Sequence, residues 1–309
     1  MGGGIPPTSD RDEVLNRLAA LRQHQQGGRR SPHKPLLVLL ALGRLSATGS
    51  STLPWAQAQT QLGNLIAEFG PSSKTSAAQS AAYPFTRLRS DGIWVLDHDV
   101  PNDNIRPLAA QHVVGSFDPV LEAVLSGDLD LISSAARALV ESHFPDTVAP
   151  DVLAAVGLDP DTVLHTADAL PDPAGVTKRR RDPTWRYAII QAWDRQCAFC
   201  GFDGQIHGAS VGIDAAHVRW FALDGPDTMD NGLALCSLHH KLFDRGAVGV
   251  DLDMRIHVSA TYNARTAAGR ALYAVHGNQL QVRPGTTLPA AEHLAWHRQE
   301  VFQGEPLTT

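Results

Sequence analysis

The chain has 309 residues, of which 43% are hydrophobic and 19% are charged, and its formal net charge is −6. This composition is typical of a globular protein long enough for two domains, and no apolar run reaches the roughly 18 to 20 residues that a membrane-spanning helix needs. The N-terminus lacks the basic and apolar regions of a secretory signal, so the expected compartment is the cytoplasm. The acidic balance excludes a chain-wide attraction to nucleic acid, and any such surface has to be local.

The first half of the chain is predicted to be mostly helical. Apolar residues recur at helical spacing from Asp10 to Gln25, and the stretch KPLLVLLALGRL, residues 34–45, is apolar nearly all round, which predicts a buried central helix. A third helix is expected from Pro54 to Phe69, and a Ser- and Ala-rich loop is expected before Tyr83. Alternating apolar residues behind the turn signal Asp91-Gly92 predict a strand. Further helices are expected at residues 118–125, 128–144 and 150–156.

The second half is predicted to mix helices and strands. A helix is expected from Trp185 to Trp193, and the stretch AVGVDLDMRIHVSA predicts a hairpin that turns at Asp251 to Asp253. Two more helices are expected from Thr266 to Ala274 and from Ala290 to Phe302. The whole chain is therefore expected to be an α+β protein.

Basic side chains gather at two places, which are the candidates for a local nucleic-acid surface. The first place holds Arg29, Arg30, His33 and Lys34, and the second is the run Lys178, Arg179, Arg180 and Arg181. The second run lies in a proline-bearing stretch that predicts a linker at residues 166–183 between domains at residues 1–165 and 184–309. Such a linker can follow the DNA backbone, which gives affinity without sequence information, or it can be a solvated, flexible segment.

The three cysteines lie close together in the second half of the chain. An odd number of cysteines in a reducing compartment argues against a disulfide framework and favours metal binding over unligated core cysteines. The pairs Cys197-x2-Cys200 and Cys236-x2-His239 can supply four ligands for a tetrahedral Zn²⁺, which would leave no open position for catalysis. The zinc is therefore expected to be structural, and the two-residue spacing favours His239 over His240 as the fourth ligand.

A second set of polar residues lies between the two ligand pairs. The stretch VGIDAAHVRW predicts a strand and CSLHHKLFD predicts a helix, with Asn231 in the loop between them. Together with the motif NGLALCSLHHKLFDRG, these segments resemble the HNH nuclease family with its ββα-metal core over about residues 185 to 260. This resemblance implies that His217 is the general base that activates water, and that Asn231 orients the catalytic strand and loop. It also implies that His240 helps to hold a catalytic divalent cation of the Mg²⁺ or Mn²⁺ class.

Several of these residues have alternative interpretations. Asp214 is either a further ligand of the catalytic cation or a structural residue, because many members of the family place the acidic ligand directly before the histidine, where Ala216 stands here. His217 could be an ordinary hydrogen-bonded histidine on a strand, and Asn231 could simply bend the loop before Gly232.

Two motifs in the first half also have a counterpart. The stretch SPHKPLLVLLAL followed by YPFTRLRSDGIW resembles the sulfur-binding domain of phosphorothioate-dependent type IV restriction endonucleases, the McrA-like enzymes, over about residues 10 to 160. In that family an apolar pocket holds the sulfur and basic groups hold the remaining phosphate oxygens. The resemblance implies that Tyr83 and Pro84 line the pocket and that His33 and Lys34 face the modified linkage. The small pocket residue of the family falls at Arg87, so either the pocket wall or the register differs here.

The expected discrimination rests on desolvation. Sulfur in place of an anionic oxygen is larger and less hydrated, so an apolar contact can favour it over ordinary phosphate. Alternatively, Tyr83 and Pro84 pack a loop beneath Trp94. The stretch from Asn102 to Arg106 and the pair Gln111-His112 could read base edges, although ordinary loop structure explains them equally well.

The sequence thus predicts an endonuclease that recognises phosphorothioated double-stranded DNA and hydrolyses a phosphodiester nearby. Its expected cofactors are a structural Zn²⁺ and a catalytic Mg²⁺- or Mn²⁺-class cation, and cleavage of both strands would call for a homodimer or two binding events. One alternative is a DNA-binding module with an inactive, zinc-stabilised HNH scaffold. Another is an HNH nuclease that reads a modified base.

Overall fold

The computed structural model describes residues 8–21, 31–165 and 182–308. The chain divides into two compact units, Met1–Lys178 and Arg179–Thr309. Each unit has its own cluster of buried apolar side chains. Two of the predicted basic segments, Arg29-Arg30 and the run from Lys178 to Arg181, lie outside the described residues, as does nearly all of the predicted linker.

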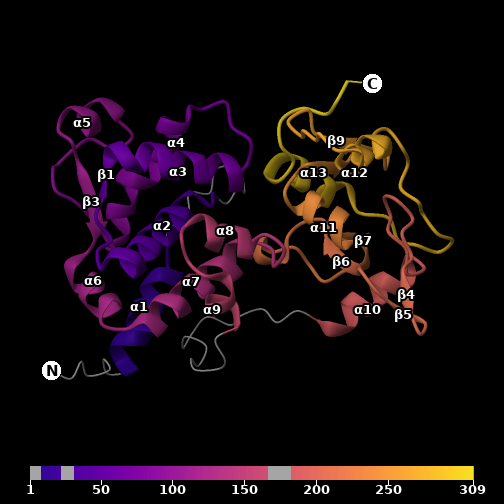
Figure 1. Ribbon diagram of the computed structural model, residues 1–309, viewed down its shortest axis with the longest axis horizontal. Helices are drawn as coiled ribbons and strands as arrows, with labels where there is room; N and C mark the ends of the chain where they lie inside the picture. Colours follow the sequence, from indigo (N-terminus) through magenta and orange to yellow (C-terminus); the bar gives the residue numbers. More distant parts are fainter. Residues whose placement is uncertain (1–7, 22–30, 166–181, 309) are drawn as a thin grey trace. The chain divides into compact units, whose positions relative to one another are not determined.

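The N-terminal unit is mostly helical, as the sequence predicts, and Figure 1 shows α2 in the middle of it. Its helices are α1 (Thr8–Ala19), α2 (His33–Thr48), α3 (Trp55–Phe69), α4 (Ala77–Arg87), the 3-10 helix η1 (Leu88–Asp91), α5 (Ile105–Ala110), α6 (Pro119–Ser126), α7 (Leu129–His143), α8 (Ala149–Ala155) and α9 (Pro160–His165). Its strands are β1 (Leu53–Pro54), β2 (Trp94–Leu96) and β3 (Val114–Phe117).

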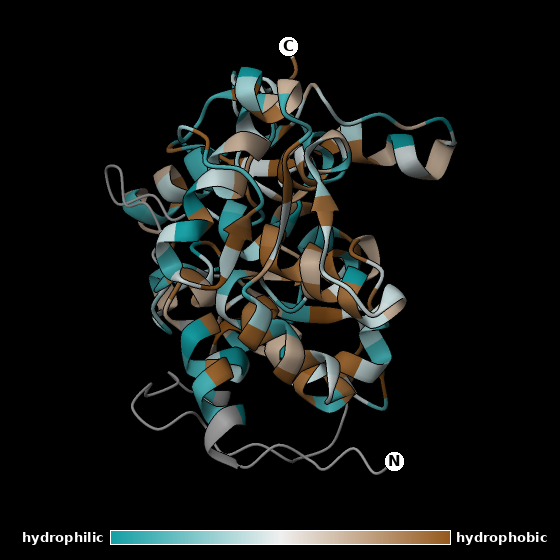
Figure 2. Ribbon diagram, turned by 90° about the vertical axis from the view of Figure 1, so that its left-hand side faces the viewer, coloured by the Kyte–Doolittle hydropathy of each residue, from teal (hydrophilic) through white to brown (hydrophobic). Residues whose placement is uncertain are grey.

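Helix α2 is the buried centre of this unit. The residues from Leu36 to Leu42 are at most 6% exposed, which confirms the prediction from their apolar run. Each buried leucine in such a helix stabilises the fold by about 2 kcal/mol. The helix ends at Gly49, whose left-handed backbone (φ 76°) lets its N–H donate to the carbonyl of Leu45. Figure 2 shows hydrophobic and hydrophilic residues mixed along many of the helices, as expected of elements with one buried and one exposed face.

A small sheet and a chain of aromatic rings hold α4 in place. The strands form an antiparallel sheet in the order β1-β3-β2, with Trp94 paired to Phe117. The Phe85 ring of α4 lies edge-on to Trp94, with ring centroids 5.9 Å apart. A side chain at Gly115 would reach within 2.4 Å of the Trp94 ring, so only glycine lets the indole lie across the sheet. The helix that carries Tyr83 is therefore fixed to a rigid aromatic core.

Helix α4 begins inside the predicted Ser- and Ala-rich loop, of which residues 71–76 are non-helical as expected. The Ser76 side chain accepts a hydrogen bond from the backbone N–H of Gln79 and so caps the helix start. Alanines favour helix once such a cap is present. Pro84 lies inside the helix, and its missing N–H did not prevent the helix from continuing to Arg87.

Helix α5 likewise takes up part of a segment predicted as a loop. Asn104, one of the residues predicted to reach base edges, caps this helix by accepting from the backbone N–H of Arg106. The Asn104 side chain is thus committed locally. Arg106, Gln111 and His112 are exposed.

The C-terminal unit mixes short strands and helices. Its helices are α10 (Pro183–Ala192), η2 (Phe221–Leu223), η3 (Met229–Asn231), α11 (Ser237–Asp244), α12 (Ala267–Arg270), η4 (Ala271–Val275) and α13 (Ala291–Glu300). Its strands are β4 (Gln205–Ile206), β5 (Ala209–Ser210), β6 (Ile213–His217), β7 (Gly232–Cys236), β8 (Val248–Val250) and β9 (Ile256–Val258). The predicted hairpin is present as β8 and β9, which pair antiparallel.

The centre of this unit is a ββα arrangement. Strands β6 and β7 pair antiparallel, with Ile213 opposite Cys236 at one end and His217 opposite Gly232 at the other. Helix α11 follows β7 directly, and α10 packs on both strands. Strand β6 and helix α11 agree with the sequence-based expectation. Strand β7, which lies in the stretch NGLALC, was not expected. Among the described helices, none combines the length and the apolar character needed to cross a membrane.

Candidate metal centre and nuclease site

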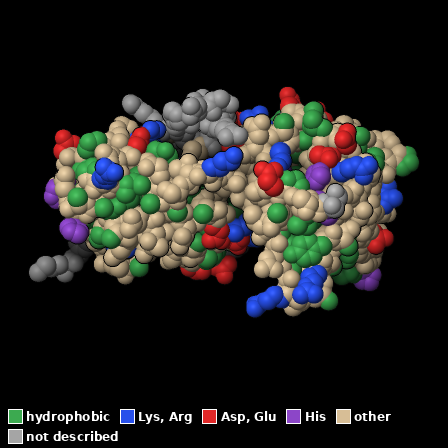
Figure 3. Space-filling view, turned by 90° about the horizontal axis from the view of Figure 1, so that it is seen from above, with side chains coloured by type: hydrophobic (Ala, Val, Ile, Leu, Met, Phe, Trp, Pro, Cys, Tyr) green, Lys and Arg blue, Asp and Glu red, His purple; other side chains and the backbone are tan. Residues whose placement is uncertain are grey.

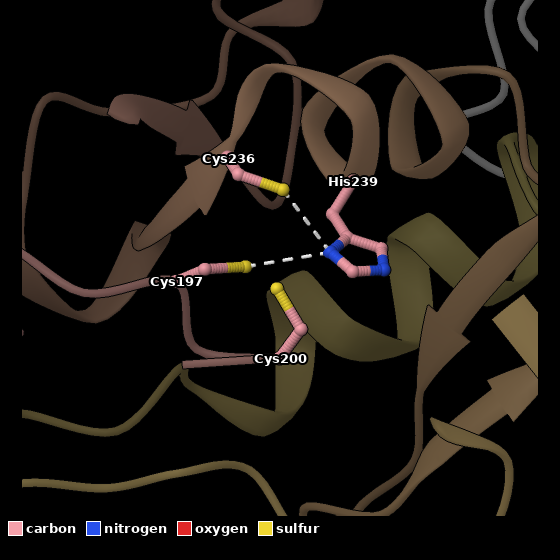
Figure 4. Close-up of side chains that lie close together, drawn as sticks. All are labelled: Cys197, Cys200, Cys236 and His239. Atoms are coloured by element: carbon pink, nitrogen blue, oxygen red, sulfur yellow. Dashed lines mark hydrogen bonds between the residues drawn. The ribbon is translucent and has the colours of Figure 1, made fainter. Parts of the chain in front are cut away.

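Three cysteines and one histidine converge at the start of α11. The ligand atoms of Cys197, Cys200, Cys236 and His239 all lie within 4.8 Å of one another. His239 points its Nδ1 at two of the sulfurs, 3.5 Å from Cys197 and 3.2 Å from Cys236 (Figure 4). This is the donor set that sequence spacing predicts, and it uses His239 rather than His240. Four such donors around one point fit a tetrahedral Zn²⁺, so the residues present fit a structural zinc site.

The three thiols differ in how readily they lose the proton that a bound zinc ion would displace. The hydrogen bond with Cys197, together with burial, raises the pKa of Cys236 to about 11, while the same contact lowers the pKa of Cys197. Burial raises the pKa of Cys200. Zinc binds thiolates, so its binding here has to release protons, and its affinity should fall in acid.

His217 ends strand β6 and is held by a carboxylate. Its Nε2 lies 2.7 Å from Oδ1 of Asp227, and both side chains are largely shielded from solvent. The other carboxylate oxygen of Asp227 accepts from the backbone N–H of Asp182, at the start of α10. Because a carboxylate can only accept, Nε2 carries the proton of the neutral imidazole and Nδ1 is its basic atom.

Asn231 is fully buried and fixes the loop that follows His217. Its Oδ1 accepts from the backbone N–H of Arg219 (2.8 Å), and its Nδ2 donates to the carbonyls of Arg219 (3.0 Å) and Pro226 (2.9 Å). The side chain thus clamps both ends of this loop next to the end of β6. This is more than the loop-bending that an asparagine before glycine would explain.

His240 stands on α11 beside the zinc-type cluster but takes no part in it. Its Nε2 lies 3.2 Å from Oδ2 of Asp244, one turn further along the helix, and the Asp244 carboxylate is almost completely buried. Two ligands at right angles around a Mg²⁺-class ion lie about 3 Å apart, given ligand distances of roughly 2.1 Å. The pair therefore fits a shared cation as well as a hydrogen bond.

Asp214 is engaged elsewhere. Its Oδ1 lies 2.7 Å from a guanidinium nitrogen of Arg186 on α10, and both side chains are substantially exposed. The ion pair gives Asp214 a structural partner that ties α10 to β6.

In the N-terminal unit, the two predicted DNA-facing segments come together. The Lys34 ammonium at the start of α2 forms an ion pair with Asp91, which ends the 3-10 helix that continues α4. The Lys34 side chain is only 14% exposed. Burial lowers the pKa of neighbouring His33 to about 4, so this histidine is neutral at physiological pH. It can donate a hydrogen bond to an anion but brings no charge, which differs from the basic role expected for it.

The predicted pocket residues lie on α4. Pro84 is buried and Tyr83 is partly exposed. The Arg87 guanidinium lies 5.3 Å from the centroid of the Tyr83 ring and forms a two-point ion pair with Asp103, one contact of which is 2.8 Å long. Hydrogen bonding to Asp103 raises the pKa of Arg87. Tyr83 is thus the accessible member of the predicted Tyr-Pro pair, and Pro84 does not reach the surface.

Charges on the surface are mixed. Figure 3 shows Lys and Arg side chains interspersed with Asp and Glu on the face it presents, without one large basic patch of described residues. This agrees with the acidic net charge.

Sequence reasoning missed Asp227 and Asp244. Both belong to motifs quoted above or lie beside them, in GPDTMDNG and KLFDRG. The available signal was weak: Asp244 stands four residues after His240, the spacing of one helical turn, whereas no spacing rule links Asp227 to His217.

Strands β6 and β7 lead directly into helix α11, and the histidine at the end of β6 is hydrogen-bonded to a carboxylate. This is the ββα arrangement that the resemblance to HNH nucleases predicts. The comparisons with known families agree. Residues 197–251 match the HNH endonuclease family, and residues 11–161 match the ScoMcrA-like DNA sulfur-binding domain. The chain therefore joins a ScoMcrA-like DNA sulfur-binding domain to an HNH endonuclease domain, the two domains that its motifs predict.

Solved structures give a more distant likeness. The sulfur-binding domain of ScoMcrA complexed with phosphorothioated DNA is 18% identical, with a TM-score of 0.41, and the match covers 47% of this chain and 94% of that one. The corresponding domain of SprMcrA, also complexed with phosphorothioated DNA, is 23% identical, with a TM-score of 0.40 and coverages of 48% and 94%. The type IV phosphorothioation-dependent restriction endonuclease ScoMcrA is 13% identical, with a TM-score of 0.38 and coverages of 88% and 87%. No curated protein matches the chain.

Proposed function

We propose that the protein recognises phosphorothioated double-stranded DNA through its N-terminal unit and hydrolyses a phosphodiester nearby with its C-terminal unit. The observation that carries this proposal is the presence, in one chain, of a ScoMcrA-like sulfur-binding domain and an HNH domain. The proposed role is restriction of modified DNA inside the cell. Cleavage of both strands would need two copies of the chain or two binding events.

His217 acts as the general base. Asp227 holds the proton on Nε2, so Nδ1 takes the proton from the attacking water, and the carboxylate stabilises the imidazolium that results. Asn231 keeps the loop after β6 in place and thereby keeps the base aimed at the scissile phosphate. Histidine suits this task because its ordinary pKa allows it to exchange a proton near neutral pH.

His240 and Asp244 hold the catalytic divalent cation. When bound, this Mg²⁺- or Mn²⁺-class ion offsets the charge that develops on the phosphate and its leaving oxygen. Asp214 is the less suitable ligand because Arg186 already neutralises it. The Cys197, Cys200, Cys236 and His239 cluster holds zinc and fixes the start of α11, which carries His240.

Selection of the modified DNA falls to α4 and the start of α2. Tyr83 offers an apolar face to the sulfur, while His33 donates a hydrogen bond to a phosphate oxygen. Lys34 and Arg87 supply positive charge once the phosphate competes with Asp91 and Asp103 for them. Exposed Arg106 adds a contact to the DNA backbone or a base.

The test compares duplexes that differ by one sulfur atom. The purified full chain is incubated with phosphorothioated and unmodified DNA, with and without Mn²⁺ or Mg²⁺, and binding and cleavage are both measured. We expect tighter binding to the sulfur-containing duplex and cleavage that depends on the cation. Binding without cleavage under every metal would indicate an inactive HNH scaffold, and equal binding to both duplexes would rule out sulfur recognition.

A further inference from the structure

The catalytic histidine proposed above has a second neighbour that the sequence did not reveal. Trp185 of α10 stacks face to face on His217, with ring centroids 3.8 Å apart and an interplanar angle of 16°. The indole is 7% exposed, so it covers one face of the imidazole with a buried aromatic surface. Phe221 approaches the same imidazole at a tilt, with centroids 5.7 Å apart.

A hydrogen bond from its N–H also fixes the indole of Trp185. Its Nε1 donates to the backbone carbonyl of Thr228 at 2.8 Å, and Thr228 is the residue after Asp227. Two adjacent residues therefore fix the positions of both rings. Thr228 accepts a hydrogen bond from Trp185, and Asp227 contacts Nε2 of His217.

The strand opposite His217 provides the space for this stack. Gly232 pairs with His217 across the ladder, and a side chain there would lie 3.0 Å from the Trp185 ring and 2.2 Å from Ile189 on the same helix. The backbone of Gly232 is extended, so no left-handed turn requires a glycine at this position. The close approach of α10 to β7 is what requires it.

From these contacts we infer that Trp185 is a positioning residue for His217. The stacked ring and the Asp227 contact at Nε2 together restrict the orientation of the imidazole, and so they set where Nδ1 lies. The electron-rich face of the indole also stabilises the imidazolium that forms when Nδ1 takes a proton from water. This inference rests on the proposed function, since a base needs positioning only if His217 acts as one.

Asp227 contacts Nε2 of His217, and the backbone of Asp182 contacts the second oxygen of that carboxylate. The guanidinium of Arg219, two residues after His217, donates to the carbonyl of Leu223. The stacked indole of Trp185 is a direct contact through which α10 acts on the imidazole.

The first experiment detects the stack without relying on cleavage. A protonated imidazole in contact with an indole quenches its fluorescence, so tryptophan emission of the full chain should fall as the pH is lowered through the titration of His217. We expect most of this fall to disappear in Trp185→Phe and in His217→Gln. The matched control is Trp193→Phe, which removes a buried indole next to the end of α10 and should leave the pH-dependent fall intact. An unchanged fall in both Trp185→Phe and His217→Gln would overturn the inference.

The second experiment tests the effect on the reaction. We expect Trp185→Leu to lower the cleavage rate at saturating DNA by about 10- to 100-fold, with unchanged DNA affinity, because a misplaced base loses near-attack geometry. Trp185→Phe keeps an aromatic face and should restore most of the rate. A role in stability alone would give equal losses in the two variants with lowered melting temperatures, and that result would contradict the inference. If the unaltered protein cleaves no DNA at all, the proposed function fails, while the emission experiment still decides whether the rings are stacked.

Discussion

Both units of this protein pair basic side chains with their own carboxylates, but the pairs have opposite consequences. In the N-terminal unit, Lys34 is paired with Asp91 and Arg87 with Asp103, so each carboxylate occupies a cation that the proposed function assigns to a DNA phosphate. In the C-terminal unit, Asp227 contacts the imidazole of His217, and in the proposed mechanism this contact makes the imidazole a better base. The same kind of contact thus opposes binding in one unit and supports chemistry in the other. Five measurements test the two halves of this contrast.

The largest effect is expected from removing zinc, because metal binding and folding are coupled in small Cys/His sites. Dialysis of the full chain against a strong chelator, or Cys236→Ser, should remove one zinc per chain and unfold the C-terminal unit while binding to phosphorothioated DNA persists. Metal content, circular dichroism and DNA binding measure the three outcomes. Exposed Ser237→Ala, the adjacent residue, is the control. Full retention of structure after zinc loss would contradict a structural role.

His217→Ala should abolish cleavage and leave DNA affinity unchanged. A positioned general base contributes about 10²- to 10⁴-fold to such a reaction, so we expect a loss of about that size. Cleavage rate and duplex binding are measured on the same preparation. His207→Asn, an exposed histidine of the same unit, should retain the normal rate. A His217→Ala protein that cuts normally would remove the proposed base.

Asp227→Asn should lower the cleavage rate less, by about 10- to 100-fold, because Nε2 keeps an acceptor but the imidazolium loses its counter-charge. DNA affinity should not change. The control is exposed Asp203→Asn, which makes the same charge change elsewhere in the unit. If both variants cleave at the same rate, the carboxylate contributes nothing to the base.

Asp103→Asn should increase DNA affinity, and this effect should be smaller than the losses of cleavage rate described above. Releasing Arg87 frees a cation for a phosphate, so DNA affinity should rise a few-fold and the salt dependence of binding should steepen by about one counterion. The control Asp99→Asn makes the same charge change without freeing Arg87, since Asp99 is exposed and lies 3.5 Å from Arg89. An equal rise in the two variants would show that only net charge matters.

The smallest effect concerns His33 and pH. Its folded-state pKa of about 4 lies below the ordinary value of 6.5, so protons bind the unfolded chain first as the pH falls. Its contribution to stability is therefore present above pH 6.5 and is lost as the pH falls from 6.5 to 4. As the pH falls through this interval, the melting temperature of His33→Gln should therefore fall less than that of the unaltered protein. The melting temperature of His98→Gln, which changes an exposed histidine, should fall as much as that of the unaltered protein. Identical pH profiles for all three proteins would show that burial of His33 has no energetic consequence.

The sequence predicted best what depends on short spacing. The zinc-type ligands follow from two pairs with two intervening residues, and the structure confirms the choice of His239. The buried centre of the N-terminal unit follows from an uninterrupted apolar run. In both cases the relevant residues are neighbours along the chain, so local pattern is sufficient.

What the sequence could not predict depends on long-range packing. The ion pair of Lys34 with Asp91 joins residues 57 positions apart. The stack of Trp185 on His217 depends on how α10 crosses a strand pair, and on a glycine in the second strand. The start of α4 was missed for a different reason, because one serine cap decided between loop and helix.

The ladder between β6 and β7 has a consequence for the accuracy of the nuclease site. It holds five residue pairs, from Ile213 opposite Cys236 to His217 opposite Gly232. Sliding one strand by a single residue would turn the imidazole to the opposite face of the sheet. A zinc ion bound at Cys236 would hold one end of the ladder and so fix the strand register that places His217, the proposed base, at the other end.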